Sequence, residues 1–270
     1  MSILHAVVLG LVQGLSEFLP ISSSGHLELT RWLFGWSELD TELETTFDVA
    51  VHLGTLVGAL AYLRRDVARL TAAGLGPVLR RRPWTTDGRI AWALVVSAVP
   101  AGIVGVLFEE QLRGADRIWL IAVMLIVFGV VLGFADRLQG TRGMQEFGWW
   151  PALAMGLGQA LALQPGVSRS GATITVGRAL GFSRDATARL AFLMSLPVIA
   201  GAGVLRFAEV SVPSSFWPPF VVGIVTSALT GYLAVWGTLV LVRTRTFGPF
   251  IVYRVVLGVA VLALLASPWR

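Results

Sequence analysis

Long apolar stretches make up most of the chain, and short polar segments separate them. Six stretches are long enough to cross a membrane as helices, which takes about 20 residues. They lie at about 47–63, 90–108, 118–135, 188–208, 218–242 and 250–266. Two other apolar stretches, 3–34 and 149–180, are interrupted by proline and serine, so each predicts a helix, a break and a second helix. Irregular backbone at membrane depth survives only where protein or water surrounds it. The pattern therefore predicts an all-α polytopic membrane protein with six transmembrane helices plus two re-entrant helix hairpins.

The two interrupted stretches repeat one another. A shift of 146 residues places Leu11, Gln13, Leu15, Ser22, Ser24 and Gly25 on Leu157, Gln159, Leu161, Ser168, Ser170 and Gly171. Three predicted spans separate the two stretches, and an odd number of crossings reverses the direction of entry. The sequence therefore predicts an inverted-topology repeat, about 1–135 and 149–266, inside a single integral membrane domain 1–270 whose breaks meet near the midplane.

The composition supports a membrane protein. Of the 270 residues, 55% are hydrophobic and 14% are charged, whereas about 25% of a soluble domain is charged. Gly54 and Gly58 have the spacing of small residues at close helix contacts. A net charge of +5 could suggest nucleic acid, but the arginines follow the predicted membrane topology, so we expect no nucleic-acid partner.

The arginines also predict the orientation. Segments 64–89, 136–148, 181–187 and 243–249 hold twelve arginines, and the segments on the other side hold four. Cytoplasmic segments are the richer in basic residues, so this side is expected to face the cytoplasm. Segment 64–89 is predicted to be a basic loop. The first hairpin then enters from outside and the second from the cytoplasm.

Polar residues gather at the two breaks. Each break ends in serines before a helix start, where unpaired N–H groups and roughly half a positive charge favour phosphate, and two such ends suit a diphosphate. Arg169 can bind phosphate oxygens bidentately. The candidates for holding substrate are Gln13, Ser22, Ser168, Ser170 and Thr173. The serines also suit helix N-caps, and Gln13 also suits a hydrogen bond to backbone at the break.

The candidate catalytic residues are Glu17, Ser23, His26 and Arg169. Glu17 suits general acid or base work and could also balance the charge of Arg169. His26 is the strongest candidate for proton transfer or nucleophilic attack, and Ser23, activated by His26 or Glu17, is the alternative nucleophile. His5 and His52 are interpreted as structural.

The sequence offers no cluster of histidine and acidic residues with the spacing of metal ligands. A divalent cation, Mg²⁺ or Ca²⁺, is expected to be held by substrate phosphates and one carboxylate, for which Glu17 is the best candidate.

These residues resemble the undecaprenyl pyrophosphate phosphatase family, also known as bacitracin-resistance proteins. A first motif, Glu or Gln followed four positions later by Glu, matches Gln13 and Glu17, ahead of the serines and Gly25-His26. A second, Pro-Gly-x-Ser-Arg-Ser-x-x-Thr, matches 165–173. The resemblance implies hydrolysis of undecaprenyl diphosphate to the monophosphate carrier lipid for cell-wall synthesis, at the outer face of the bacterial plasma membrane. It also implies dependence on a divalent cation and important roles for Glu17, Ser23, His26, Arg169 and Thr173.

A transporter or flippase for an anionic or lipid-phosphate substrate is the alternative, because inverted repeats with broken helices are common in transporters. The expected partners are a prenyl diphosphate lipid and membrane lipids, and a homodimer is possible.

Overall fold

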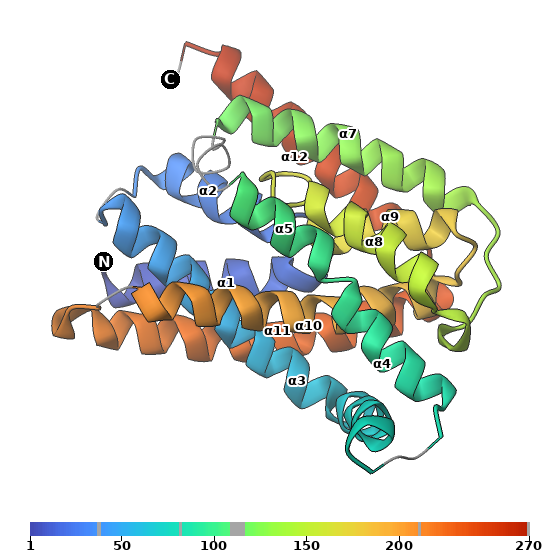
Figure 1. The fold of residues 1–270 in the computed structure, drawn as a ribbon. Helices are drawn as coiled ribbons and strands as arrows, with labels where there is room; N and C mark the ends of the chain where they lie inside the picture. Colours follow the sequence, from blue (N-terminus) through green and yellow to red (C-terminus); the bar gives the residue numbers. More distant parts are fainter. Residues whose placement is uncertain (37–38, 81–82, 109–116, 210–211, 269–270) are drawn as a thin grey trace.

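The computed structural model describes residues 1–36, 39–80, 83–108, 117–209 and 212–268. Its helices, drawn in Figure 1, are α1 (Ile3–Phe18), α2 (Ser23–Phe34), α3 (Thr41–Arg80), α4 (Thr86–Val96), α5 (Val99–Leu107), α7 (Ile118–Arg137), α8 (Trp149–Leu161), α9 (Arg169–Ala179), α10 (Arg184–Glu209), α11 (Trp217–Thr244) and α12 (Gly248–Ala266). Two short 3₁₀ turns, η1 (Met144–Glu146) and η2 (Ser214–Phe216), lie between them. The described residues form no β-strand, which confirms the all-α prediction.

The described residues contain six helices that are long and apolar enough to cross a membrane. They are Thr41–Leu79, Thr86–Leu107, Ile118–Arg137, Arg184–Leu205, Ser214–Thr244 and Gly248–Ala266. The second joins α4 and α5, and each of the six overlaps one predicted span. The chain is therefore a multi-pass membrane protein.

The prediction of a basic loop at 64–89 is wrong for most of its length, because α3 continues to Arg80. The continuation has an apolar side that packs on α4: Leu70 is buried, and the indole N–H of Trp92 donates to the Gly74 carbonyl at 3.1 Å. Asp66 pairs with Arg69 and Arg189 on the polar side. Four arginines of the orientation count, Arg81, Arg82, Arg113 and Arg270, lie outside the described residues.

Neither interrupted stretch contains a helix of spanning length. The helices α1 and α2 have 16 and 12 residues, and α8 and α9 have 13 and 11. Both second helices are capped by serines 146 positions apart, Ser22 and Ser168, whose φ angles are +77° and +75°. Such angles are uncommon outside glycine, so the repeat extends to an unusual backbone conformation. That the two stretches turn back within the membrane stays a prediction.

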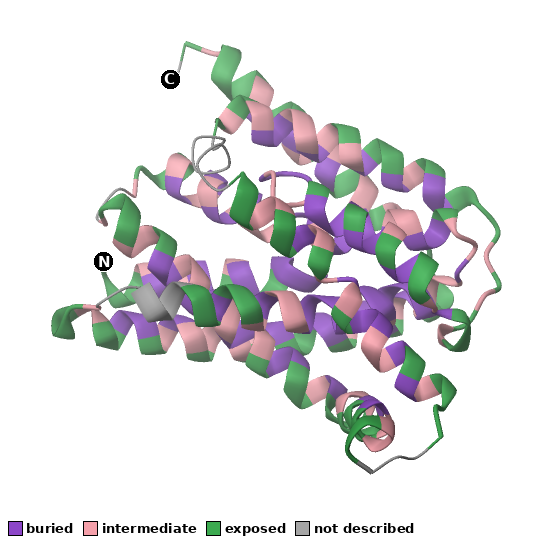
Figure 2. Ribbon diagram, in the orientation of Figure 1, coloured by how far each residue is buried: buried purple, intermediate pink, exposed green. Residues whose placement is uncertain are grey.

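The helices also pack in a pattern that follows the repeat. In the first half, α1 packs on α11, and in the second half its equivalent α8 packs on α4 and α5. The equivalent pairs α7 and α12, and α3 and α10, pack on each other (Figure 1). The broken stretches carry many buried residues, and α7 and α12 carry many exposed ones (Figure 2). The helices α1 and α8 also have one exposed apolar side, which includes Leu4, Leu157 and Leu161.

Glycines bring α3 and α11 into close contact, as predicted for Gly54 and Gly58. A Cβ atom added to Gly58 would lie 2.9 Å from the backbone nitrogen of Tyr232, and one added to Gly54 would lie 3.1 Å from the Ile224 carbonyl carbon. Because the neighbours are backbone atoms, they cannot move aside as a flexible side chain would.

We expect Gly58→Leu to lower the stability of the protein by about 1–3 kcal/mol, the usual cost of overpacking. Thermal unfolding in detergent measures the change. Gly237→Leu on α11 is the control, because a Cβ atom at Gly237 meets nothing within 4 Å. Equal melting temperatures for the two variants would contradict the close contact.

Candidate active site

The two breaks in the helices are hydrogen-bonded to each other. The Ser22 hydroxyl accepts from the backbone N–H of Gly166 at 3.0 Å. In the other direction, the Ser170 hydroxyl donates to the Leu19 carbonyl at 2.9 Å. The breaks therefore meet, as the repeat predicts, although segments almost 150 residues apart in sequence form them.

Arg254 of α12 joins both breaks from one side. It is fully buried, and its guanidinium donates to the carbonyls of Pro20 at 3.0 Å, Gly166 at 2.9 Å and Val167 at 3.0 Å. Its Nε donates to the Leu125 carbonyl of α7 at 3.1 Å. A broken helix leaves carbonyls without partners, and the guanidinium, with five N–H donors, supplies them.

Arg254 is not among the residues predicted from the sequence, although it lies inside the predicted span 250–266. An arginine within an apolar span is itself a signal of a functional or structural site, because its insertion is costly.

Glu17, at the end of α1, is the centre of the polar cluster. Its side chain is only 2% exposed. One carboxylate oxygen, Oε2, accepts from Gln13 at 2.8 Å and from the Ser23 hydroxyl at 2.6 Å. The other, Oε1, forms an ion pair with Arg169. The structure thus brings together three of the four predicted catalytic residues.

Ser23 and Arg169 occupy equivalent positions in the repeat. Each is the first residue of the second helix of its stretch and follows the serine with a positive φ. The shared backbone conformation therefore directs two different side chains, a hydroxyl and a guanidinium, to the same carboxylate.

His52 of α3 also reaches this cluster, and its interpretation as purely structural needs correction. Its Nε2 lies 3.4 Å from Oε2 of Glu17, and its Nδ1 lies 2.6 Å from the Asp48 carbonyl. The contact depends on the packing of α3 against α1, so its neighbours in sequence do not reveal it. Its position as an ionisable residue within a span was the available signal.

His26 lies on α2, and both nitrogens of its ring are hydrogen-bonded. Nδ1 is 2.7 Å from the Ser22 carbonyl, and Nε2 is 2.8 Å from the Tyr253 hydroxyl. A carbonyl only accepts, so in the neutral ring Nδ1 carries the proton and Nε2 accepts from Tyr253. His26 is thus bonded to the first break and to α12.

The predicted substrate-binding hydroxyls support the backbone of the breaks. Ser22 accepts from Gly25 N–H at 3.4 Å, and Ser168 accepts from Gly171 N–H at 3.1 Å. Thr173 donates to the Arg169 carbonyl at 2.8 Å. The N-cap interpretation of Ser22 and Ser168 is confirmed, and their contact with a substrate stays a prediction.

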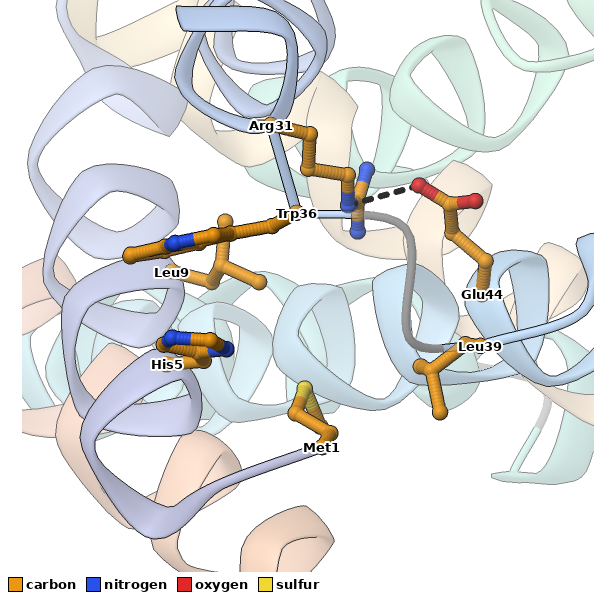
Figure 3. A pocket seen from close by; sticks show the side chains of 7 residues that line it. All are labelled: Met1, His5, Leu9, Arg31, Trp36, Leu39 and Glu44. Atoms are coloured by element: carbon orange, nitrogen blue, oxygen red, sulfur yellow. Dashed lines mark ion pairs between the residues drawn. The ribbon is translucent and has the colours of Figure 1, made fainter. Parts of the chain in front are cut away.

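An ion-pair cluster links α2 to α3 beside the site. Arg31 pairs with Asp48, and the Nε of Arg31 lies 2.7 Å from a carboxylate oxygen of Glu44. The backbone carbonyl of Asp48 accepts the hydrogen bond from His52. Figure 3 shows Arg31 and Glu44 at a small hollow of about 20 Å³ that His5 also lines. His5 stacks on Trp36 with the rings 3.8 Å apart, so it belongs to this hollow.

The donors at Glu17 bear on the expected divalent cation. No group of three or more His, Cys, Asp or Glu side chains in the described part of the chain could hold a metal ion. Glu17 offers one carboxylate. A divalent cation needs several oxygen ligands, so most of the ligands of a cation at Glu17 would have to come from a bound molecule. Substrate phosphates would supply such ligands.

Comparison with known proteins identifies the family. The family model described as "Bacitracin resistance protein BacA" matches residues 6–260. A protein named undecaprenyl-diphosphatase from Pelotomaculum thermopropionicum is 44% identical over 269 residues, which cover 99% of this chain and 98% of that protein. Proteins of the same name from Pelobacter propionicus and a Nocardioides species are 45% and 42% identical, over 99% and 98% of this chain and 98% and 97% of their own lengths. With its two polar breaks joined at one carboxylate and this similarity over nearly its whole length, the chain belongs to the bacitracin resistance protein BacA family.

Proposed function

We propose that the chain is an enzyme that hydrolyses undecaprenyl diphosphate to undecaprenyl phosphate and inorganic phosphate, and so recycles a lipid carrier for cell-wall synthesis. The relatives carry the name of this activity. The observation that carries the proposal is the convergence of Ser23 and Arg169 on Glu17. It combines a nucleophile, a base within hydrogen-bonding distance and a cation for phosphate.

Ser23 is the nucleophile in this proposal, because its hydroxyl already donates to Glu17 at 2.6 Å. Glu17 takes the hydroxyl proton as Oγ attacks the terminal phosphorus, and the bond from that phosphorus to the bridging oxygen breaks. The proton passes to the leaving undecaprenyl phosphate. Water then attacks the phosphoserine and gives a proton to Glu17, the bond from phosphorus to Oγ breaks, and Glu17 returns the proton to Oγ, which releases phosphate and restores the serine.

Arg169 holds the terminal phosphate. Its guanidinium pairs with Glu17, and an entering phosphate competes for the same N–H groups, which leaves the carboxylate less strongly bound and more basic. The helices α2 and α9 begin at Ser23 and Arg169, so their N-terminal N–H groups add donors for developing charge. His26 has a positioning role, since it bonds the carbonyl of Ser22 next to the nucleophile.

The location follows from the substrate and the arginines. A long prenyl chain stays in the bilayer, so we place the site in the bacterial plasma membrane, open toward its outer face. The arginine-rich segments then face the cytoplasm. The re-entrant course of both broken stretches and the single-domain organisation belong to this proposal, and a homodimer is compatible with it.

A transporter or flippase is the second candidate, and the repeated packing of the two halves around the joined breaks favours it. The two functions differ in one simple respect. A phosphatase releases phosphate in detergent, where transport across a membrane cannot occur.

The purified protein is therefore expected to release inorganic phosphate from undecaprenyl diphosphate in detergent. Ser23→Ala and Glu17→Gln should reduce turnover by about 10²-fold or more, as is usual when a nucleophile or base is removed. Ser24→Ala is the neighbouring control. No release by the wild type would contradict the activity itself.

Labelled substrate distinguishes the nucleophiles. Rapid quenching is expected to trap an acid-stable label on the protein that Ser23→Ala abolishes. An acid-labile, base-stable label that disappears in His26→Ala would instead assign the attack to His26.

Arg169→Lys tests bidentate phosphate binding. Lysine keeps the charge but loses the planar fork, and a hydrogen bond to a charged group contributes about 1.5–3 kcal/mol. We expect kcat/KM to fall roughly tenfold to a hundredfold. Wild-type kinetics in this variant would exclude a bidentate role.

Chelation tests the divalent cation. EDTA is expected to stop phosphate release, and Mg²⁺ or Ca²⁺ to restore it. Because substrate phosphates supply most ligands in this proposal, Mg²⁺ should also strengthen binding of methylene diphosphonate, measured by calorimetry, and Glu17→Gln should remove that gain. Equal binding with and without Mg²⁺ would rule out a bridging cation.

A further inference from the structure

A basic groove lies at the ends of four long helices, away from Glu17. It consists of two adjoining hollows of about 580 and 490 Å³, which share Arg184 and Arg243. The arginines that line the basic groove are Arg137, Arg178, Arg184, Arg243 and Arg245. The groove is separate from the catalytic cluster, because α9 has Arg169 at its start and Arg178 nine residues later, about 14 Å along the helix.

The groove has more positive than negative charge. Asp136 and Asp185 are the carboxylates that pair with its arginines. Asp136 is buried and already accepts from Arg184 at 2.6 Å and from the Phe247 backbone N–H at 3.0 Å. Asp185 pairs with Arg243 at 3.1 Å. The five arginines thus exceed the two carboxylates by three charges.

Arg178 is the buried arginine of the groove. The side chain is 3% exposed, and its two terminal nitrogens donate to the carbonyls of Phe182 and Leu138. Within the described residues, its Nε has no hydrogen-bond partner, since the nearest carboxylate oxygen, on Asp136, lies 3.7 Å away. Arg178 and Arg184 thus share the charge of Asp136, which leaves less negative charge for the exposed arginines of the groove.

The ordinary electrostatics of helix ends explain only some of these arginines. Arg137 and Arg243 lie in the last turns of α7 and α11, where a positive charge is favourable. Arg245 is the C-cap residue of α11, so the dipole of that helix favours its charge as well. Arg184 begins α10, where the helix dipole disfavours a cation. Arg184 pairs with Asp136 and Arg243 with Asp185, so Arg137 and Arg245 are the exposed charges of the groove that an anion could match.

The position of the groove identifies the kind of anion. Arg137, Arg184, Thr244 and Gly248 are the ends of four candidate membrane spans. The ends of spans lie at the level of lipid headgroups, and basic pockets between such helices bind anionic headgroups. We propose that the basic groove binds the headgroup phosphate of an anionic phospholipid, with phosphatidylglycerol as the simplest example.

The test compares two double variants of the full-length protein that lose the same charge. Arg243→Gln with Arg245→Gln removes two exposed arginines of the groove, and Arg64→Gln with Arg65→Gln removes two exposed arginines of α3. Native mass spectrometry in detergent measures binding of phosphatidylglycerol and phosphatidylcholine. We expect the groove variant to bind phosphatidylglycerol about tenfold more weakly than the wild type, and the α3 variant to change little. Phosphate release from undecaprenyl diphosphate in detergent should be unchanged in both.

Two results would overturn the proposal. Equal loss in both variants would mean that lipid binding follows net charge alone. Competition by millimolar inorganic phosphate, with no preference for phosphatidylglycerol over phosphatidylcholine, would make the groove a site for free anions. If the double groove variant does not fold, Arg137→Gln, at an exposed position, replaces it under the same criteria.

Discussion

The buried guanidinium of Arg254 holds together the two broken helices on which the site is built. A break inside an apolar environment exposes carbonyls that water cannot reach, and each unbonded group is costly. Arg254 donates to carbonyls of both breaks, and these bonds in turn make burial of its charge tolerable. The breaks and the arginine therefore depend on each other. Because the bonds come from α12, the last helix of the chain, the site cannot be completed until both halves of the repeat have packed.

The two breaks have the same backbone conformation but carry different side chains. Ser22 and Ser168 share a positive φ and a capping hydrogen bond, so the residue after each of them has the same place relative to its own break. The first half places Ser23 there and the second half places Arg169. A hydroxyl and a guanidinium thus meet at Glu17 because the breaks meet. This polar cluster lies among helices of 11 to 16 residues, which are too short to span a membrane.

Glu17 shows how polar groups are kept together in an apolar protein. Gln13, Ser23, Arg169 and His52 all contact its carboxylate, and they come from both halves of the repeat. One carboxylate thus provides hydrogen-bond or ion-pair partners for several buried polar side chains, which limits the free-energy cost of burying them. The basic groove has a different character. It lies at the ends of four membrane spans, where its excess positive charge can contact anionic lipid headgroups.

The six spans, the two breaks and the repeat could be read from the sequence, because hydropathy, proline and serine act locally along the chain. Glu17, Ser23 and Arg169 could be selected as well, since polar residues at membrane depth are few and costly. The tertiary structure alone decided that residues 64–80 continue α3, because Leu70 and Gly74 pack on α4. It alone placed His52 at Glu17 and Arg254 at both breaks. The partners of a buried polar side chain depend on which helices pack side by side, and no pattern of neighbouring residues encodes that.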